Sequence, residues 1–234
     1  MPIVFSTDYP AGRTQNDRFI ESMKRRYSSS RAVDIRHGTV RRLSTHNSTI
    51  TARRELSHHM CLSRRHAAPH VYAAWIETIN ARTVLYVVMP EFTPFTDVLS
   101  TTFGKLEPQR ESFNALMRKL FTRVASCDII QTDCNPGNFV VTMNEDAGIE
   151  SIYIIDFDPI YTIGIGSLKR AQAARLMFAL FRLFLSRFVS GMSYPKRADR
   201  FVRNMMKEHK TLADRIHELS ILDSSESSFA RCDL

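Results

Sequence analysis

The spacing of hydrophobic positions changes from strand-like to helix-like near residue 92. Within residues 1–92, short runs bounded by turn residues predict strands, and one stretch with apolar residues three and four apart predicts a helix. The predicted strands cover residues 32–37 and 39–44, joined at Gly38, and two segments that flank Asn80 within 69–92; the predicted helix covers 49–65, with Ser48 or Thr49 as its cap. The second segment of the 69–92 pair is almost wholly apolar, which predicts a strand buried on both faces.

Beyond residue 92 the helical spacing dominates. Helices are predicted at 108–125, 168–189 and 201–222, and one hairpin at 139–142 and 149–155, with its turn at 144–148. The order of these elements predicts an α+β chain with two lobes. Residues 1–92 form a small β-rich lobe and residues 93–234 form a reduced helical lobe with one hairpin.

Charge is distributed unevenly between these two parts. Residues 1–70 hold 13 Lys and Arg against 5 Asp and Glu, a net charge of +8, whereas residues 71–234 hold 19 of each. Such a basic region favours an anionic partner, which could be nucleic acid, an acidic protein or the phosphates of a nucleotide. A solvated basic surface with no partner explains the same charge equally well.

Composition and cysteine spacing narrow the class of protein. The chain is 44% hydrophobic and 24% charged, which is typical of a globular protein with a core. Its four cysteines are far apart and form no Cys-x-x-Cys pair, so neither a zinc site nor a disulfide framework is indicated. The first residues lack the layout of a signal peptide, and the longest apolar run, 176–189, contains two arginines and is too short to span a bilayer. We therefore expect a soluble intracellular protein without a membrane span.

Two apolar runs each end at an aspartate, although a buried charge is costly to desolvate. Residues 129–141 read IIQTDCNPGNFVV, and residues 153–160 read YIIDFDPI. Asp133 and Asn138 are five residues apart with Pro-Gly between them, and Asp156 ends a strand that can pair with the strand after Asn138. The hairpin would gather three oxygen-bearing side chains in one place. Such hard oxygen ligands suit Mg²⁺, and a nearby carboxylate could accept a hydroxyl proton.

These two stretches resemble the catalytic loop, H-x-D-x-x-x-x-N, and the metal-binding D-F-G of the protein-kinase-like superfamily. The resemblance implies that Asp133 is the catalytic base. It also implies that Asn138 and Asp156 are magnesium ligands, with Asp158 near enough to help hold the metal. The cofactors implied are ATP and Mg²⁺. The alternative is that both stretches are turn-forming Asp and Asn clusters at strand ends.

The resemblance extends less sharply into the first lobe. The apolar strand VLYVVMPE resembles the strand that leads to the hinge of a kinase, which implies that Met89 is the gatekeeper and that Glu91 lies at the adenine. Glu55 corresponds to the glutamate of the lysine–glutamate ion pair, although an exposed charge beside two arginines is nearly as good an interpretation. The lysine itself is missing. Arg41 stands in its place, with Arg42 as second choice, and we expect Arg41 to pair with Glu55.

The chain departs from the family pattern elsewhere too. No G-x-G-x-x-G is present, and serines 28–30 are the candidates for the turn that covers the phosphates. Gln131 replaces the histidine of the catalytic loop, and Asp158 replaces the glycine of D-F-G. No A-P-E follows, and the segment before the next helix is short. We therefore expect a metal site held in one state, with no phosphorylation switch in this segment.

The sequence thus predicts an unusual, small phosphotransferase that resembles divergent kinases of large DNA viruses or bacterial effectors. A protein Ser/Thr kinase is the first choice. A small-molecule kinase resembling the aminoglycoside and choline phosphotransferases is the second. A pseudokinase whose basic lobe binds an acidic partner or nucleic acid is the third, and the missing lysine is the feature in its favour.

Overall fold

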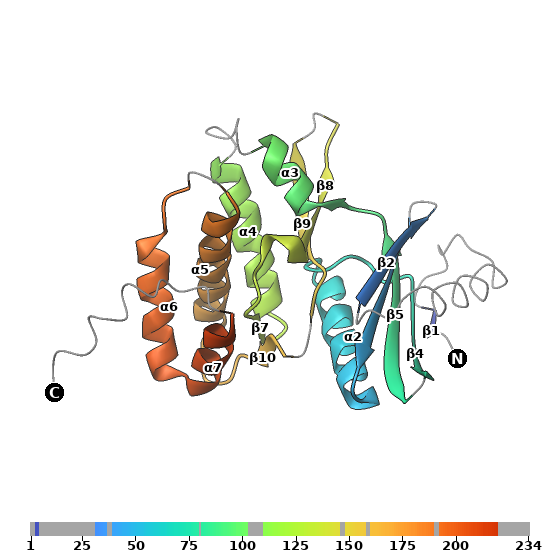
Figure 1. The fold of residues 1–234 in the computed structure, drawn as a ribbon. Coiled ribbons are helices and arrows are strands. Elements are labelled where there is room, and N and C mark those ends of the chain that lie inside the picture. Colours follow the sequence, from blue (N-terminus) through green and yellow to red (C-terminus); the bar gives the residue numbers. More distant parts are fainter. Residues whose placement is uncertain are drawn as a thin grey trace. The chain divides into compact units, whose positions relative to one another are not determined.

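The computed structural model describes residues 3–4, 31–36, 39–79, 81–102, 110–145, 148–157, 160–189 and 192–219, and the chain is mixed α and β (Figure 1). The described residues form six α-helices and several small sheets. The chain divides into two compact units, Met1–Phe92 and Thr93–Leu234, and each unit is described by itself below.

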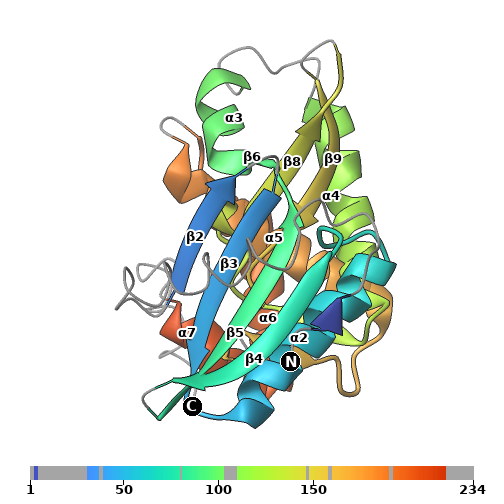
Figure 2. The same ribbon diagram turned by 90° about the vertical axis from the view of Figure 1, so that its right-hand side faces the viewer.

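The first unit is built on one antiparallel sheet. Its strands are β1 (Ile3–Val4), β2 (Arg31–Arg36), β3 (Thr39–His46), β4 (Ala73–Ile79) and β5 (Arg82–Pro90). They lie in the order β1-β4-β5-β3-β2 (Figure 2). The predicted hairpin of β2 and β3 is confirmed, with Arg36 paired to Thr39; its turn residues, 37 and 38, lie outside the described part of the chain.

The single helix of this unit, α2 (Thr49–Arg64), follows β3 directly. Ser48 caps it, as predicted: the backbone N–H of Thr51 donates to the Ser48 hydroxyl at 3.2 Å, which satisfies an N–H group that lacks a helical partner. One face of the sheet packs on α2 through a buried apolar cluster made of Ala52, Val71, Ala74, Leu85, Val87 and Met89. This burial of apolar surface holds the helix against the sheet.

Strand β5 lies inside the sheet with residues 83–89 all buried, which confirms that both of its faces are covered. Side chains alternate along a strand, so Leu85 and Val87 point towards α2 while Tyr86 points the other way. On that second face Trp75 and Tyr86 are paired across the strands, and their rings stack with centroids 4.8 Å apart.

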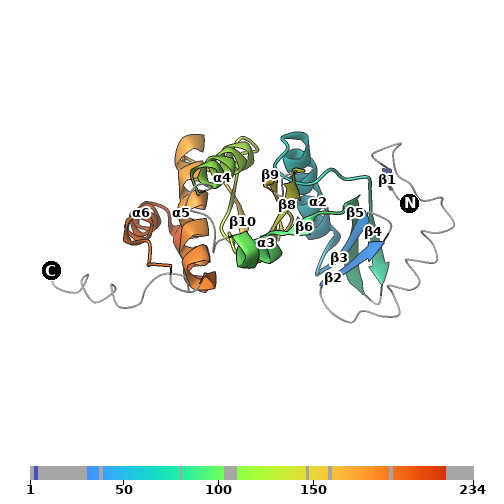
Figure 3. The ribbon, with the colours of Figure 1, turned by 90° about the horizontal axis from the view of Figure 1, so that it is seen from above.

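The second unit contains most of the helices. They are α3 (Phe95–Thr102), α4 (Arg110–Ala125), α5 (Arg170–Phe188), α6 (Lys196–Glu208) and α7 (Lys210–Glu218), with α4, α5 and α6 packed in sequence (Figure 3). Its strands are β6 (Thr93–Pro94), β8 (Phe139–Met143) and β9 (Ile149–Ile154) in one sheet, and β7 (Ile129–Gln131) with β10 (Thr162–Gly164) in another; a 3₁₀ turn, η2, covers Pro136–Asn138. The hairpin predicted at 139–142 and 149–155 is therefore confirmed.

Phenylalanines form the core of this unit. Phe181 of α5 lies within 5.4–6.3 Å, between ring centroids, of rings from α3, α4 and β8, which are Phe95, Phe113, Phe121 and Phe139. All five rings are buried. Because Phe139 directly follows Asn138, this cluster anchors the chain on one side of the candidate site.

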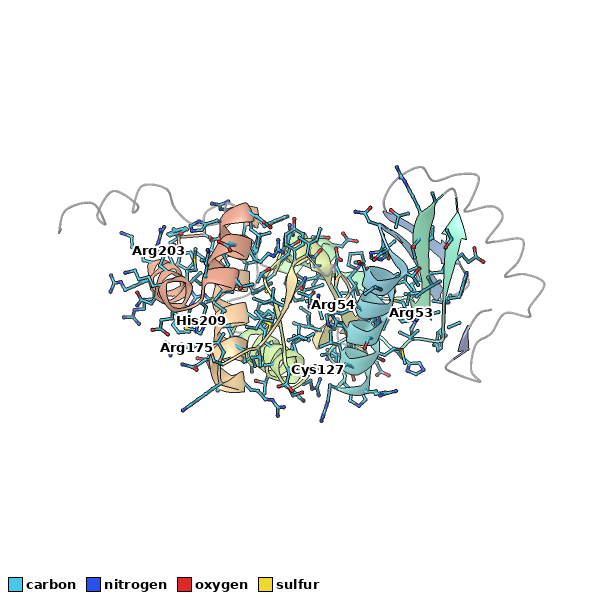
Figure 4. The ribbon with its side chains drawn as sticks, turned by 90° about the horizontal axis from the view of Figure 1, so that it is seen from below. Arg53, Arg54, Cys127, Arg175, Arg203 and His209 are labelled. Atoms are coloured by element: carbon cyan, nitrogen blue, oxygen red, sulfur yellow. The ribbon has the colours of Figure 1, made fainter. Side chains whose placement is uncertain are left out.

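The prediction of one last helix at 201–222 is wrong: two helices stand in its place, and the first begins earlier. The chain forms α6 and α7 with a break at His209, and residues beyond 219 lie outside the described part. Helix α6 begins earlier because Asp199, buried in its first turn, accepts hydrogen bonds from Tyr194 and Arg203, both at 2.8 Å. A carboxylate in the first turn also interacts favourably with the helix dipole. Arg175 of α5 reaches α6, with its guanidinium 4.4 Å from the centre of the Phe201 ring (Figure 4).

Of the helices described, none combines the length and apolar character needed to cross a membrane. The longest is α5, which begins at Arg170, two residues later than predicted. Leu168 instead belongs to a turn in which its N–H donates to the carbonyl of Ile165.

Candidate functional site in the second unit

A tight turn after β7 carries Asp133 and Asn138. The side chain of Asn135 accepts a hydrogen bond from the N–H of Gly137 at 2.9 Å, and the carbonyl of Asn135 accepts one from the N–H of Asn138 at 2.9 Å. These bonds close the 3₁₀ turn and send the chain back past Asp133 into β8. The Asx turn is what a short Asn-Pro-Gly sequence favours.

The amide of Asn138 is oriented by this turn. Its Nδ2 donates to the carbonyl of Asp133 at 3.0 Å, so its Oδ1 points away from that carbonyl and can accept from or ligate another group. Both residues are half-buried. The carbonyl of Asn138 accepts from the N–H of Ile155 at 3.0 Å, which holds the end of β9 beside the turn. Asp156 follows as the next residue and is half-buried as well.

A buried glutamine joins the two aspartate-bearing loops. Gln131 is 1% exposed, and its Nε2 donates to the carbonyl of Asp156 at 2.9 Å, with the carbonyl of Asp133 at 3.5 Å. Its Oε1 accepts from the hydroxyl of Thr162 at 2.8 Å. One side chain thus ties β7, the end of β9 and β10 together, in a setting where an unsatisfied polar group would be costly.

The segment after Asp156 is fixed to β7 over its described length. Thr132 donates to the carbonyl of Tyr161 from both its N–H, at 2.8 Å, and its hydroxyl, at 2.9 Å. Residues 162–164 pair with 129–131, and the N–H of Ile165 donates to the carbonyl of Asp128. Asp128 also holds Arg170, the first residue of α5, through two hydrogen bonds of 2.8 and 3.0 Å.

Hydrogen bonds hold together the loops that carry Asp133, Asn138 and Asp156, three of the predicted site residues in this unit. Asp158 lies outside the described residues. Within the part of the chain that is described, no group of three or more His, Cys, Asp or Glu side chains is placed to hold a metal ion. The carboxylate of Asp156 and the amide oxygen of Asn138 still fit Mg²⁺, because this ion keeps several waters and is bound through one or two carboxylates together with substrate phosphates.

Cys134 lies beside the candidate base but is not a candidate nucleophile. Burial raises the pKa of its thiol well above the ordinary value, and the nearby charge of Asp133 raises this pKa further. The thiol donates to the carbonyl of Gln131 at 3.2 Å. Each unit by which a thiol pKa rises lowers the reactive thiolate fraction at a given pH about tenfold.

We therefore predict that Cys134 resists alkylation in the folded protein. At pH 8, iodoacetamide should modify the half-buried Cys61 and Cys127 long before Cys134, as measured by mass spectrometry of peptides over time. In urea all three should react at similar rates, because the burial that disfavours the thiolate is gone. Rapid native labelling of Cys134 would show that the loop after β7 opens readily.

Glu55 in the first unit is buried, with 1% exposure, whereas its neighbours Arg53 and Arg54 are exposed on α2 (Figure 4). Its carboxylate accepts hydrogen bonds from the hydroxyl of Ser44 at 3.3 and 3.4 Å and lies 2.9 Å from Nε2 of His46. Ser44 and His46 both belong to β3. The interpretation of Glu55 as an exposed charge is therefore wrong.

The face of β3 that meets α2 is set by strand alternation. Ser44 and His46 lie on this face, and position 42 shares it, while position 41 belongs to the opposite face. Val40 pairs with Met89 and Arg42 pairs with Val87, and both partners belong to the apolar cluster under α2. The side chains of Arg41 and Arg42 lie outside the described part, so the pairing of Arg41 with Glu55 stays a prediction, and the backbone favours Arg42.

The remaining predicted residues of this unit are at the end of β5. Met89 is buried in the apolar cluster that faces α2, and Glu91 is exposed just after the strand. Serines 28–30, the candidates for a phosphate-covering turn, lie outside the described residues.

The sequence interpretation missed four positioning residues: Gln131, Thr162, Ser44 and His46. In the resemblance to the kinase catalytic loop, Gln131 is only a departure from the motif. The signal that could have identified it is a polar residue that ends the short apolar strand IIQ, since a buried polar side chain needs a partner. The partners of Ser44 and His46 lie in another element and leave no local pattern.

A scan against protein-family models finds no match for this chain, and a search of curated proteins finds no similar sequence. Its function must therefore be inferred from the geometry of the two units.

Proposed function

We propose that the chain is an ATP- and Mg²⁺-dependent phosphotransferase with a two-lobed, protein-kinase-like fold. The observation that carries the proposal is the hydrogen-bonded pair of loops in the second unit. Gln131 holds the backbone at Asp156 beside the turn in which Asn138 donates to the carbonyl of Asp133. Catalysis of phosphoryl transfer consists mainly of positioning and charge stabilisation, so a rigid constellation of these three residues suits it.

The roles follow from the chemistry of each side chain. Asp133 is half-buried and acceptor-only when ionised, so it orients the acceptor hydroxyl and takes its proton. Asn138 Oδ1 and the carboxylate of Asp156 would hold Mg²⁺, with Asp158 as a further ligand. When bound, Mg²⁺ neutralises charge on the phosphate oxygens of the nucleotide. The buried Gln131 keeps the two loops from separating when the carboxylates repel each other.

In this proposal the first unit binds the nucleotide. Kinases use a cation on a strand that contacts the phosphates and pairs with a glutamate of the following helix. Here β3 is followed directly by α2, and the buried Glu55 of α2 is held by Ser44 and His46 of β3. Met89 would then stand as gatekeeper and Glu91 at the adenine.

Because the lysine is missing, either of two neighbouring arginines could contact the phosphates of ATP, and the KM for ATP of two variants distinguishes them. Because position 42 shares the face of Glu55, Arg42→Ala should raise the KM for ATP about tenfold, and Arg41→Ala should change it little. A hydrogen bond to a charged group contributes roughly 1.5–3 kcal/mol, and 1.4 kcal/mol corresponds to tenfold. Steady-state kinetics over a range of ATP concentrations measures the KM of both variants. The two variants remove the same charge from adjacent positions of β3.

The opposite ranking, with Arg41→Ala the more damaging, would restore the assignment made from sequence alone and contradict the face assigned here. Equal and small effects would mean that neither arginine contacts the nucleotide.

The acceptor is a protein Ser or Thr in our first proposal, and a small-molecule alcohol in the second. The observation that favours the second is the fixed segment after Asp156, in which Thr132 and Asp128 hold the backbone of residues 161 and 165. Over the residues described, this segment forms no long platform for a peptide. Thr162 is 1% exposed and its hydroxyl donates to Gln131, so this hydroxyl is not accessible for phosphorylation.

The experiment incubates the purified chain with γ-labelled ATP and either Mg²⁺ or EDTA. Acceptors are the chain itself, a generic protein substrate such as casein, and a panel of aminoglycosides and amino alcohols. Mg²⁺-dependent transfer to any of them supports the proposal and identifies the acceptor class. Nucleotide binding without transfer or hydrolysis would instead favour a pseudokinase.

A further inference from the structure

The solvent face of α2 and of its C-cap is strongly basic. Its exposed cationic side chains are Arg53, Arg54, Arg64 and Arg65. The one carboxylate of the helix, that of Glu55, is on the buried face, where Ser44 and His46 hold it. Among the described residues, none of the four arginines has a carboxylate within ion-pair distance. Their guanidinium groups are therefore available to an anion from outside the chain.

The four arginines form two rows along the helix. Arg53 and Arg64 are eleven residues apart, as are Arg54 and Arg65. Eleven residues are close to three turns at about 3.6 residues per turn, so each pair lies along one side of the exposed face. At a rise of about 1.5 Å per residue, the two arginines of a row start roughly 16 Å apart. The face thus presents positive charge in two lines rather than at one point.

We propose that this face of α2 binds duplex DNA through its phosphates, independently of base sequence. A guanidinium matches phosphate oxygens through paired hydrogen bonds, and such contacts supply the affinity of sequence-independent binding. An α-helix about 10–12 Å across fits the major groove of B-DNA, which is about 12 Å wide, so the two rows can meet the phosphates on its two sides. Ser57 and Cys61 lie between the rows, and their small side chains let the duplex approach closely.

The composition of this face disfavours the other polyanions. Helix α2 contains no Phe, Trp or Tyr, so it offers no aromatic platform on which the bases of a single strand would stack. The major groove of duplex RNA is too narrow to admit the helix. A membrane-surface helix needs an apolar face, and here Ile50, 80% exposed in the first turn, is an isolated apolar side chain of a kind common on protein surfaces.

Helix α6 has a second basic face, which suits a phosphate backbone less well. Arg197 and Arg200 are exposed there, but Arg203 is held by Asp199 at 2.8 Å. The exposed Glu208 adds a negative charge at the end of the helix. Because a carboxylate repels phosphate, we expect α2 and not α6 to bind DNA, and α6 provides the matched control.

Fluorescence anisotropy of a short labelled DNA duplex, titrated with the full chain between about 50 and 200 mM salt, tests the proposal. With four phosphate contacts, the logarithm of the affinity should fall with the logarithm of the salt concentration with a slope of about −3 to −4. The double variants Arg53→Gln/Arg64→Gln and Arg54→Gln/Arg65→Gln should each weaken binding about tenfold and reduce this slope by about 2. Circular dichroism verifies that they remain folded.

Arg197→Gln/Arg200→Gln removes the same charge from exposed positions of α6 and should bind DNA like the wild type. Cys61 provides a readout that needs no substitution: saturating duplex DNA should slow its alkylation by iodoacetamide several-fold and leave that of Cys127, in the second unit, unchanged. None of these measurements requires ATP or Mg²⁺, so their failure would leave the proposed phosphotransfer untouched.

Single-stranded DNA, duplex RNA and vesicles of phosphatidylserine and phosphatidylcholine are the competing probes, and each should bind more weakly than duplex DNA. Tighter binding of any of them would overturn the proposal. So would equal losses in the α2 and α6 variants, an unchanged rate of Cys61 alkylation at saturating DNA, or no binding of duplex DNA at the lowest salt concentration.

Discussion

Asp156→Asn should remove Mg²⁺-dependent phosphoryl transfer while leaving the second unit folded. The substitution keeps the shape of the side chain and the backbone carbonyl that accepts from Gln131, so the clamp between the loops persists. It removes the carboxylate charge that would hold the metal. Loss of one group that stabilises charge in a transition state costs on the order of 10²–10³ in rate. Transfer from γ-labelled ATP and the Mg²⁺ dependence of nucleotide binding measure the effect.

Stability provides the internal control for this variant. Without metal, neutralising one of two neighbouring carboxylates relieves repulsion, so the unfolding midpoint in urea should stay the same or rise slightly. Glu150→Gln, an exposed position on β9, is the matched charge change and should keep full activity. A folded Asp156→Asn protein with wild-type transfer would rule out the metal role of Asp156.

Gln131→Leu should lower the free energy of unfolding by about 2–4 kcal/mol and also reduce transfer. The leucine cannot donate to the carbonyl of Asp156 or accept from Thr162, and each buried polar group that loses its partner costs roughly 1–3 kcal/mol. The loop that carries Asp156 is then no longer held beside Asp133. Urea unfolding followed by circular dichroism gives the stability, and transfer assays well below the unfolding midpoint give the activity.

A double-mutant cycle separates the clamp from general damage to the core. Thr162→Val alone removes the same 2.8 Å hydrogen bond from the other side, so the double variant should be less destabilised than the sum of the single variants. Thr122→Val, at an exposed position of α4, should change stability by less than about 0.5 kcal/mol. Strict additivity of Gln131→Leu and Thr162→Val would mean that the two side chains do not act as one unit.

Most of the helices and strands were predictable because residues close in the sequence, such as turn and cap residues, determine where they begin and end. The 139–155 hairpin follows from two apolar runs around an Asn-containing turn, and α2 begins where Ser48 can cap it. The break between α6 and α7 was missed because the apolar spacing continues across it, from Met205 and Met206 to Leu212. The spacing of apolar residues indicates which face of a helix is buried. It does not reveal a break between two helices when the same spacing continues across the break.

In the candidate site too, local sequence predicts some contacts and not others. Asp133 and Asn138 are close in sequence, and a single turn joins them, so spacing alone predicted their proximity. The hydrogen bonds of Gln131 reach residues 25 and 31 positions away, and no local pattern encodes them. The choice between Arg41 and Arg42 depends on strand alternation, in which a shift of one residue reverses the face. The contacts of Ser44 and His46 with Glu55, together with the pairing of β3 with β5, identify that face.

The most direct measurement compares wild type and Asp133→Asn for both binding and transfer of γ-labelled ATP in the presence of Mg²⁺. The half-buried Asp133 is proposed as the base and not as a metal ligand, so the variant should bind Mg²⁺ and nucleotide like the wild type. Its transfer should fall by about 10²–10⁴-fold, the usual contribution of a positioned general base. Wild-type transfer in a folded Asp133→Asn protein, or no Mg²⁺-dependent transfer or hydrolysis by the wild type itself, would contradict a phosphotransferase built on this loop.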